Sequence, residues 1–391
     1  MAGSYIVAGA RTPIGKMSGA LASFSAADLG GLAIAGALQR AGVAPSDVDH
    51  VIMGQVLMAG QGQVPSRQAA VKAGIPMSVP AVNVNKVCLS GLNAIYLADQ
   101  MIQAGDADIV IAGGMESMTN APYLASGARG GFRYGNTELK DAIIADGLWC
   151  AFDACLMGLG TERYAAGGIT RQQQDDLAMK SNQRAAAAAD KLAEEIVPVS
   201  IPQRKGDPVV VSRDEGVRAD TTMDTLGGLK PAFDKEGTIT AANASQISDG
   251  GSAVVVMSER AVKARGVSPL GQIVSYGMVA GPDNASLLTQ PSRAILKALD
   301  KVGMKVGDVN LFELNEAFAA VGIASMADLG ISDDIVNVNG GAIALGHPIG
   351  MSGNRLALTI LHELKRRGGG VGAAALCGGG GQGDALIVRT V

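Results

Sequence analysis

The feature of this 391-residue chain that most constrains its fold is an internal repeat. Five landmarks occur twice in the same order: an Ile-Val pair, a helical stretch followed by a glycine, a Val-Asn-Val-Asn run, an apolar run ending in glycine, and a final apolar strand. They lie at 6–7 and 273–274, 26–43 and 290–304, 82–85 and 336–339, 109–114 and 373–378, and 249–256 and 382–388. A duplicated chain predicts two similar halves packed together as a pseudo-dimer.

The two copies differ by an insertion. Between its fourth and fifth landmarks, the first copy carries about 125 additional residues, 121–245, and these are richer in charge than the rest. They include the clearest surface-helix composition of the chain, over 172–195. We therefore expect a first half of residues 1–120 plus 246–268, an inserted domain of residues 121–245 that acts as a lid or binding subdomain, and a second half of residues 269–391.

Each copy alternates strand-like apolar runs with helical patterns. In residues 91–104, for example, Ala94, Ile95 and Ala98 fall on one helical face. This alternation favours an α/β protein of βαβ units with mostly parallel sheets, which binds ligands at the carboxyl ends of its strands. Aromatic residues are only 3% of the chain, so small side chains and close backbone approach must provide the packing.

Composition excludes several classes. The net charge of −4 and the lack of a basic cluster argue against a nucleic-acid partner. The longest uncharged stretch, 335–354, is interrupted by asparagine, glycine, histidine and proline, so it is not a membrane span. The N-terminus enters a strand pattern without a leader, which predicts a cytoplasmic protein. The four cysteines show no C-x-x-C spacing, and with no His-rich cluster we expect no metal.

Cys88 is the first candidate for chemistry. A single cysteine in an alanine-rich chain is usually a small buried hydrophobe. Cys88, however, follows a predicted strand at 82–87 and precedes a helix that begins near Ser90. The positive end of the helix dipole and its free N–H groups would lower the pKa of the thiol, and we predict a nucleophile.

Three further residues stand near glycines. His347 lies in Gly-His-Pro-Ile-Gly, although a lone histidine is more often structural. Cys377 precedes four glycines without the lysine or the context of a phosphate-binding loop, so N–H groups of Cys88 and Gly379 could instead face a thioester oxyanion. Asn315 is either a satisfied turn residue or part of a second oxyanion hole. His50 and His362 stay unassigned.

A thiolate, a second base and an imidazole are what carbon–carbon bond chemistry on thioesters requires. At these residues the chain resembles the thiolase family. The likeness covers essentially the whole chain and depends on Val-Cys-Leu-Ser-Gly-Leu at 87–92, Asn-Glu-Ala-Phe-Ala-Ala at 315–320, Gly-His-Pro-Ile-Gly at 346–350 and Cys-Gly-Gly-Gly-Gly-Gln-Gly at 377–383. Gly-Gly-Met-Glu-Ser-Met at 113–118 and the segment 232–245 match as well.

This resemblance implies a duplicated αβαβα core with a loop domain that binds coenzyme A, assembled as a homodimer or homotetramer. It implies an acetyl-CoA C-acetyltransferase that joins two acetyl-CoA into acetoacetyl-CoA and CoA, or the reverse thiolysis, with no cofactor because the CoA thioesters are substrates. By resemblance Cys88 is acylated, His347 activates it, and Cys377 moves the proton on carbon. Asn315, through a water, and His347 would form one oxyanion hole, and the N–H groups of Cys88 and Gly379 the other.

The same resemblance suggests contacts to coenzyme A. Arg218 would lie near the adenine and phosphate end, and the pantetheine arm would contact Leu148, Met157, Phe233, Ala241, Ser245 and Phe318. One departure concerns the substrate. Acetoacetyl-specific thiolases often read His-Met-Gly where this chain has Leu156-Met157-Gly158. A longer or branched 3-ketoacyl-CoA, as in fatty-acid β-oxidation or branched acyl-CoA degradation, is therefore an alternative substrate.

Two other classes remain as rivals. A non-catalytic acyl-CoA or lipid-binding relative would have lost one of Cys88, His347 and Cys377, and all three are present. A thiol hydrolase with a Cys–His pair would have no use for Cys377.

Overall fold

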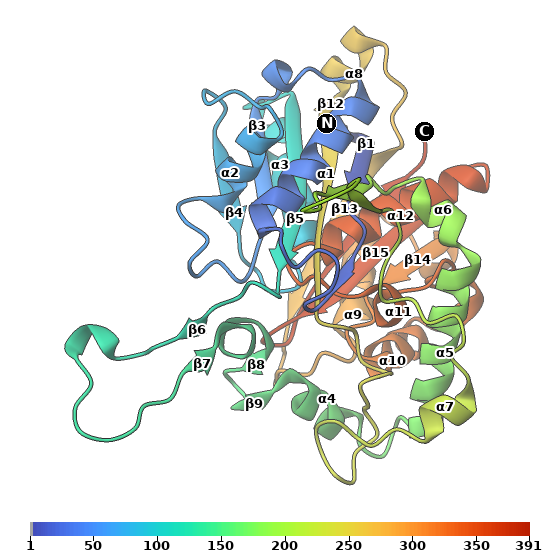
Figure 1. Cartoon of the computed structure of the whole chain (residues 1–391). Helices are drawn as coiled ribbons and strands as arrows, with labels where there is room; N and C mark the ends of the chain where they lie inside the picture. Colours follow the sequence, from blue (N-terminus) through green and yellow to red (C-terminus); the bar gives the residue numbers. More distant parts are fainter. Residues whose placement is uncertain (1–2) are drawn as a thin grey trace.

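The computed structural model describes residues 3–391, and its centre is one large mixed sheet (Figure 1). Its strands run in the order β14-β15-β16-β13-β1-β12-β5-β3-β4, with the short β2 beside β12. The bounds are β1 Ser4–Arg11, β2 Gly15–Lys16, β3 His50–Gly54, β4 Ala81–Val84, β5 Ile109–Ser117, β12 Ser248–Ser258, β13 Gly271–Ala280, β14 Leu311–Leu314, β15 Val371–Gly378 and β16 Gln382–Arg389.

The two repeated halves meet at β1 and β13, which pair antiparallel through Tyr5 with Gln272 and Ile6 with Gly271. Antiparallel neighbours of equivalent sequence are what a twofold relation between the halves produces. Each strand also has an irregularity at the same place, between Ile6 and Ala8 in β1 and between Ile273 and Ser275 in β13. The predicted duplicated core is confirmed.

The expected mostly parallel sheet needs a correction. Among the named strands of residues 3–391, the parallel pairs of the sheet are β3–β4, β3–β5 and β14–β15. In each half one strand, β12 or β16, runs against all the others and lies between two of them, so its pairs are antiparallel. In the second half the reason is local. The glycine turn after β15 makes a tight hairpin, with Gly380 and Gly381 in the left-handed region, and a hairpin joins antiparallel strands.

The strands divide their side chains between two faces, which gives the layers. Val254 and Val256 pack inward with α3 (Ser90–Ala104) and α12 (Ser352–Arg366), the two helices between the halves. Ala253 and Val255 point to the other face. That outer face is covered by α1 (Ala26–Ala41), α2 (Pro65–Lys72) and α8 (Glu259–Arg265), and the second half is covered by α9 (Gln290–Asp300) and α10 (Ala319–Leu329). Each half of the continuous sheet therefore forms one layer, and the order of layers is helix, sheet, helix, sheet, helix, as the resemblance implied.

The inserted residues form an arm and a helical cover. Figure 1 shows the arm, with β6 (Tyr123–Leu124) and β7 (Lys140–Asp141) at its base, projecting from the body. The other inserted elements are η2 (Ala128–Gly130), η3 (Ile143–Leu148), β8 (Trp149–Cys150), β9 (Cys155–Leu156), α4 (Met157–Ala165), α5 (Arg171–Ala187), α6 (Ala189–Ala193), β10 (Val199–Ile201), β11 (Val209–Val211) and α7 (Met223–Gly227). The short remaining elements are η1 (Pro45–Asp47), η4 (Val306–Asp308), η5 (Asp333–Ile335) and α11 (Ala342–Leu345).

The helical cover is tied to the core by buried charges. Arg11 of β1 is fully buried and pairs with Glu195 at 3.0 Å and Asp214 at 2.6 Å, both from the insertion. Ala185 and Leu192 of the cover pack against Leu345 in α11, just before the predicted histidine. The insertion therefore reaches the candidate site as well as the surface. None of the helices within residues 3–391 combines the length and hydropathy that a membrane crossing requires.

Candidate active site

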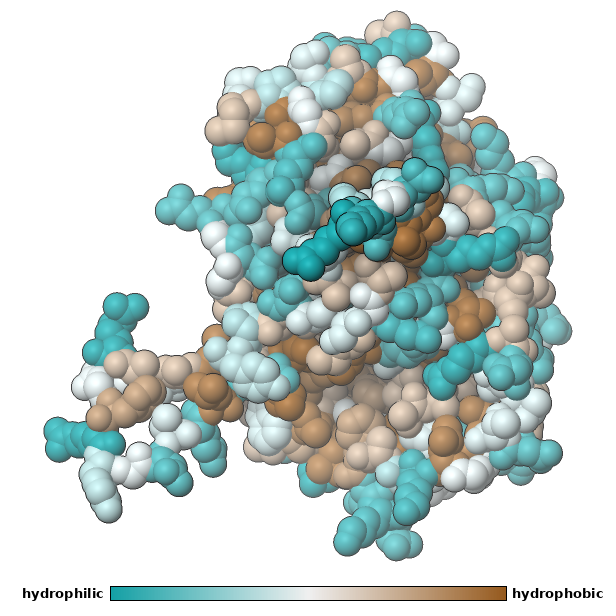
Figure 2. Space-filling model, in the orientation of Figure 1, coloured by the Kyte–Doolittle hydropathy of each residue, from teal (hydrophilic) through white to brown (hydrophobic). Residues whose placement is uncertain are grey.

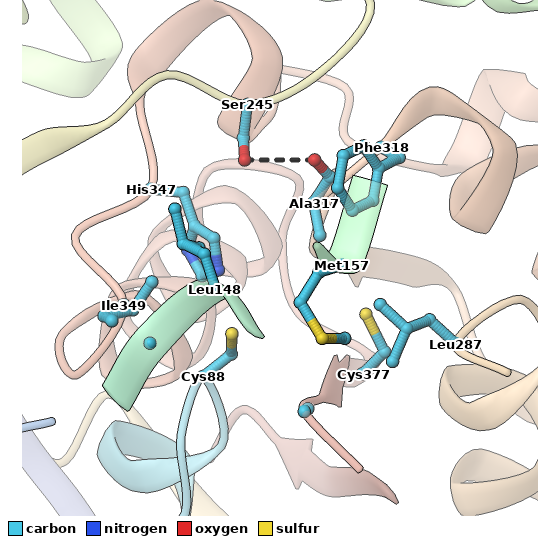
Figure 3. A pocket seen from close by; sticks show the side chains of 13 residues that line it. Cys88, Leu148, Met157, Ser245, Leu287, Ala317, Phe318, His347, Ile349 and Cys377 are labelled. Carbon is cyan, nitrogen blue, oxygen red and sulfur yellow. Dashed lines mark hydrogen bonds between the residues drawn. The ribbon is translucent and has the colours of Figure 1, made fainter. Parts of the chain in front are cut away.

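Cys88 lies in a turn between β4 and α3 that is held under strain. Val87 has φ of +50°, unusual for a β-branched residue and worth roughly 1–3 kcal/mol of strain. The buried Ser90 hydroxyl holds this turn by accepting the Lys86 N–H at 2.8 Å and donating to the Val87 carbonyl at 2.6 Å. The strand predicted at 82–87 consequently ends at Val84, and Cys88 faces a cavity instead of continuing the sheet (Figure 3).

His347 lies between α11 and α12 and its hydrogen bonds define its tautomer. The Ser352 hydroxyl donates to the Pro348 carbonyl at 2.9 Å, so its oxygen is the acceptor for Nδ1–H of His347 at 2.5 Å. Nε2 is then unprotonated and accepts from Nδ2 of Asn315 at 3.3 Å. Burial, together with the nearby Arg355 charge, lowers the pKa of His347 to about 3. The ring is therefore a neutral base at pH 7.

Both candidate thiols and this imidazole line one cavity of about 50 Å³ (Figure 3). Its walls are Cys88, Gly147, Leu148, Met157, Ser245, Leu287, Ala317, Phe318, His347, Ile349, Cys377, Gly378 and Gly379. The volume exceeds the minimum of roughly 10–15 Å³ that a water needs, so the cavity can hold a group larger than one water. Cys377, at the end of β15, is only 1% exposed.

The predicted lowering of the Cys88 pKa is wrong. Burial, with a smaller contribution from the nearby Glu116 carboxylate, raises the pKa of the Cys88 thiol to about 12. The N–H groups of Cys88 and Gly379 lower it without offsetting burial. Burial and the neighbouring Cys88 also raise the pKa of Cys377. A helix start favours a thiolate only when it outweighs the loss of water, and here it does not.

A larger apolar cavity of about 590 Å³ shares several walls with the first, including Leu148, Ser245, Phe318 and His347. Its size is typical of a ligand pocket. It adds Leu156, Phe233 and Ala241, and the rings of Phe233 and Phe318 meet edge to face at 6.1 Å. Six of the seven predicted coenzyme A contacts thus line one cavity or both, namely Leu148, Met157, Phe233, Ala241, Ser245 and Phe318. Arg218 lines neither, and its side chain is exposed.

Asn315 is fully buried beside His347, and its two amide atoms differ. Nδ2 reaches His347, whereas Oδ1 has no hydrogen-bond partner within residues 3–391. A buried unpaired oxygen costs roughly 1–3 kcal/mol, which argues against a satisfied turn residue and favours a place for a water or a ligand group.

Sequence reasoning missed Ser352, Leu287 and Ile349. Ser352 had a signal in the repeat, because Ser-Gly opens both α3 and α12. Leu287 and Ile349 are apolar residues without a chemical signature. Within the part of the chain that the structure describes, no group of three or more His, Cys, Asp or Glu side chains could hold a metal ion.

Two thiols and an imidazole in one cavity are the groups that acyl transfer through a cysteine would use. Comparison with known families agrees. The family described as thiolase, N-terminal domain matches residues 4–260, and thiolase, C-terminal domain matches residues 267–390. The chain belongs to the thiolase family, whose members are acyltransferases.

Individual relatives match over nearly their whole length. The chain is 55% identical to a probable acetyl-CoA acetyltransferase of Mycobacterium tuberculosis over 100% of both chains. It is 53% identical to an acetyl-CoA acetyltransferase of Cupriavidus necator and 49% identical to one of Pseudomonas aeruginosa, over 98% of each chain in both cases.

Proposed function

We propose that this protein is an acetyl-CoA C-acetyltransferase, which condenses two acetyl-CoA to acetoacetyl-CoA and CoA and catalyses the reverse thiolysis. The observation that carries the proposal is the single small cavity lined by Cys88, Cys377 and His347. The names of the relatives at 49–55% identity support it.

The first half-reaction forms an acyl-enzyme. Nε2 of His347 takes the proton from the Cys88 thiol as the sulfur attacks the thioester carbonyl, so no free thiolate accumulates despite the raised pKa. N–H groups of Cys88 and Gly379 stabilise the oxyanion. The carbon–sulfur bond to CoA then breaks, and CoA leaves with the proton from His347.

The second half-reaction makes the carbon–carbon bond. His347, neutral again, takes the proton of the Cys377 thiol, and the resulting thiolate removes a proton from the methyl group of a second acetyl-CoA. Protonated His347 and Asn315, through a water at its unpaired Oδ1, stabilise the enolate oxygen. The carbanion attacks the acyl carbon on Cys88 and expels the Cys88 thiolate, which takes its proton back from His347. Every group in this scheme belongs to the chain or to the CoA thioesters, so the proposal includes no cofactor.

We also propose that coenzyme A lies along the larger cavity with residues 121–245 as its binding domain. Its apolar walls suit the pantetheine arm, and the exposed Arg218 is available to the phosphates beyond it.

One observation favours a second substrate class. Leu156 lines the larger cavity and adds apolar surface at the position where the family resemblance suggests that acetoacetyl-specific members often have a histidine. A 3-ketoacyl-CoA of greater length or with a branch, as in β-oxidation, is the alternative substrate.

Assembly and location complete the proposal. The arm exposes Tyr123, Phe132, Tyr134 and Leu139, and the space-filling view shows it standing clear of the body with apolar and polar residues along it (Figure 2). Four large exposed side chains on one projection favour a homodimer or homotetramer in which another subunit covers them. A cytoplasmic location stays a prediction.

The decisive assay follows acetoacetyl-CoA with and without free CoA. We expect loss that requires CoA and yields acetyl-CoA. Loss without CoA would indicate a hydrolase, and no loss would indicate a binding protein. Cys88→Ala should abolish the reaction. Cys150→Ala is the matched control, because Cys150 is a buried cysteine that lines neither cavity, and it should retain activity.

A further inference from the structure

The segment that carries His347 crosses from its own half and enters the other. The carbonyl oxygen of Gly350 lies so close to Gly54, Gly91 and Gly114 that a Cβ atom on any of the three would fall within 3 Å of it. These glycines stand at the end of β3, at the start of α3 and in β5. The turn that contains His347 and Gly350 therefore packs directly against the backbone at positions where a side chain larger than glycine would clash.

Glu116 holds this turn in place through a hydrogen bond to the backbone of Gly350. It lies near the end of β5 and is fully buried. Its Oε2 accepts the Gly350 N–H at 2.9 Å and the Val56 N–H at 3.0 Å, and its Oε1 accepts the Leu57 N–H at 3.1 Å. One carboxylate thus binds three N–H groups on two backbone segments, one from each half, and in its ionised form these bonds are of the strong charge-assisted kind.

The three N–H donors belong to the segments that position the His347 imidazole and the Cys88 thiol. Gly350 is in the same turn as His347, between Pro348 and the start of α12. Val56 and Leu57 belong to the apolar cluster that packs against Cys88. A shift of Glu116 would therefore change how the imidazole faces the sulfur.

We propose that Glu116 is a positioning residue for acyl transfer, which aligns His347 with Cys88 by binding the backbone beneath both. This inference rests on the proposed function. Neither the motif residues nor the comparisons assign a role to Glu116, and it lines neither cavity.

The charge of Glu116 disfavours ionisation of Cys88, whereas its hydrogen bonds favour the alignment of Cys88 with His347. Variants can therefore separate the electrostatic effect from the positioning effect. Burial and the neighbouring Asp249 raise the pKa of Glu116 to about 7, and its three N–H partners lower it. Its negative charge raises the pKa of the Cys88 thiol. Removing the charge should make Cys88 easier to ionise, while removing the hydrogen bonds should misalign it.

The test compares Glu116→Gln with Glu116→Leu. Glutamine can place its carbonyl oxygen at the Oε2 position and keep the bonds to Gly350 and Val56, whereas leucine keeps none. We expect Glu116→Gln to retain kcat within about tenfold. Glu116→Leu should lose on the order of 10²-fold in kcat with KM for acetyl-CoA nearly unchanged, the size of effect that a misplacement of about 1 Å produces.

Iodoacetamide alkylation of Cys88 against pH gives the second readout. Both variants remove the charge, so both midpoints should move to lower pH than that of the wild type. Asp49→Asn is the matched control. Asp49 binds the N–H groups of Asp108 and Ile109 at the opposite end of β5, and this variant should change neither kcat nor the midpoint.

The outcomes separate cleanly. A folded Glu116→Leu enzyme with kcat within threefold of the wild type would overturn the proposal, as would equal kcat in the leucine and glutamine variants. If Glu116→Leu does not fold, Glu116→Asp replaces it, because the shorter side chain keeps the charge but cannot span all three donors, and undiminished kcat would again overturn the proposal. An inactive wild type would instead refute the proposed function, and the alkylation midpoints would still report on Glu116.

Discussion

Replacing Cys377 with alanine should split the reaction into its two halves. Cys88, His347 and the N–H groups that face the acyl oxygen are untouched by Cys377→Ala, so the acetyl-enzyme should still form from acetyl-CoA. Condensation and thiolysis should fail, because no thiol remains to move the proton on carbon. The structure makes this a local change, since Cys377 is 1% exposed, borders the reaction cavity and packs in an apolar cluster with Leu287, Ala317 and Val321.

The expected loss follows from the role. A positioned general acid or base contributes about 10²–10⁴ in rate, which is about 3–5 kcal/mol of activation free energy. Deleting one buried sulfur should cost on the order of 1 kcal/mol of stability, close to the transfer free energy of one buried methylene. The variant should therefore remain folded, and the activity loss should exceed anything that partial unfolding explains.

The assay uses radiolabelled acetyl-CoA and acid quenching on the millisecond to second scale. Protein-bound label should appear in the wild type and in Cys377→Ala at similar initial rates and be absent in Cys88→Ala. Acetoacetyl-CoA should form only in the wild type. Unimpaired condensation by Cys377→Ala would refute the two-thiol mechanism, and failure to acylate would show that Cys377 also serves the first half-reaction.

Two further predictions concern pH and substrate. The folded pKa of His347, about 3, lies below its unfolded value of 6.5, so the stability that the neutral ring contributes is complete above pH 6.5 and is lost as pH falls toward 3. Relative to His347→Gln, the wild type should lose about 2 kcal/mol of unfolding free energy between pH 7.5 and pH 5 in urea titrations, and identical pH dependence would contradict this. For Leu156, each accepted methylene contributes about 0.8 kcal/mol, or several-fold in kcat/KM. Thiolysis of four- to eight-carbon and 2-methyl four-carbon 3-ketoacyl-CoA should therefore include at least one longer or branched substrate cleaved as well as acetoacetyl-CoA, more so than in Leu156→His; rejection of them all would exclude the wider specificity.

The sequence predicted the fold, and it selected Cys88, His347 and Cys377, which the structure places around one cavity, because repeats and reactive residues beside glycines can be read locally. The repeat can be recognised without information about packing, and a cysteine or histidine beside glycine indicates a side chain at a turn. The pKa of the Cys88 thiol could not be predicted from the local sequence in the same way. The helix start at Ser90 suggested a low thiol pKa, but how much water Cys88 loses depends on Leu148, Ile349 and Phe318, which arrive from distant segments. The reversed strands were missed for a similar reason, since strand direction depends on connections and not on apolar runs.

Comparison of the two halves shows why the proposed nucleophile, Cys88, lies in one copy and the proposed base, His347, in the other. In the first half α3 begins at Ser90, five residues after Asn85. In the second half α12 begins at Ser352, thirteen residues after the equivalent Asn339, so the junction before this helix is eight residues longer. The short junction strains Val87 and leaves Cys88 at the helix start. The long one has the length to form α11, carry His347 and cross into the first half, where Glu116 binds it. Because α3 and α12 pack against each other in the central layer, the two junctions open toward the same cavity. A symmetric pair of short junctions would present two similar turns and would lack the segment that carries His347, so the proposed acyl transfer requires the unequal lengths of the two junctions.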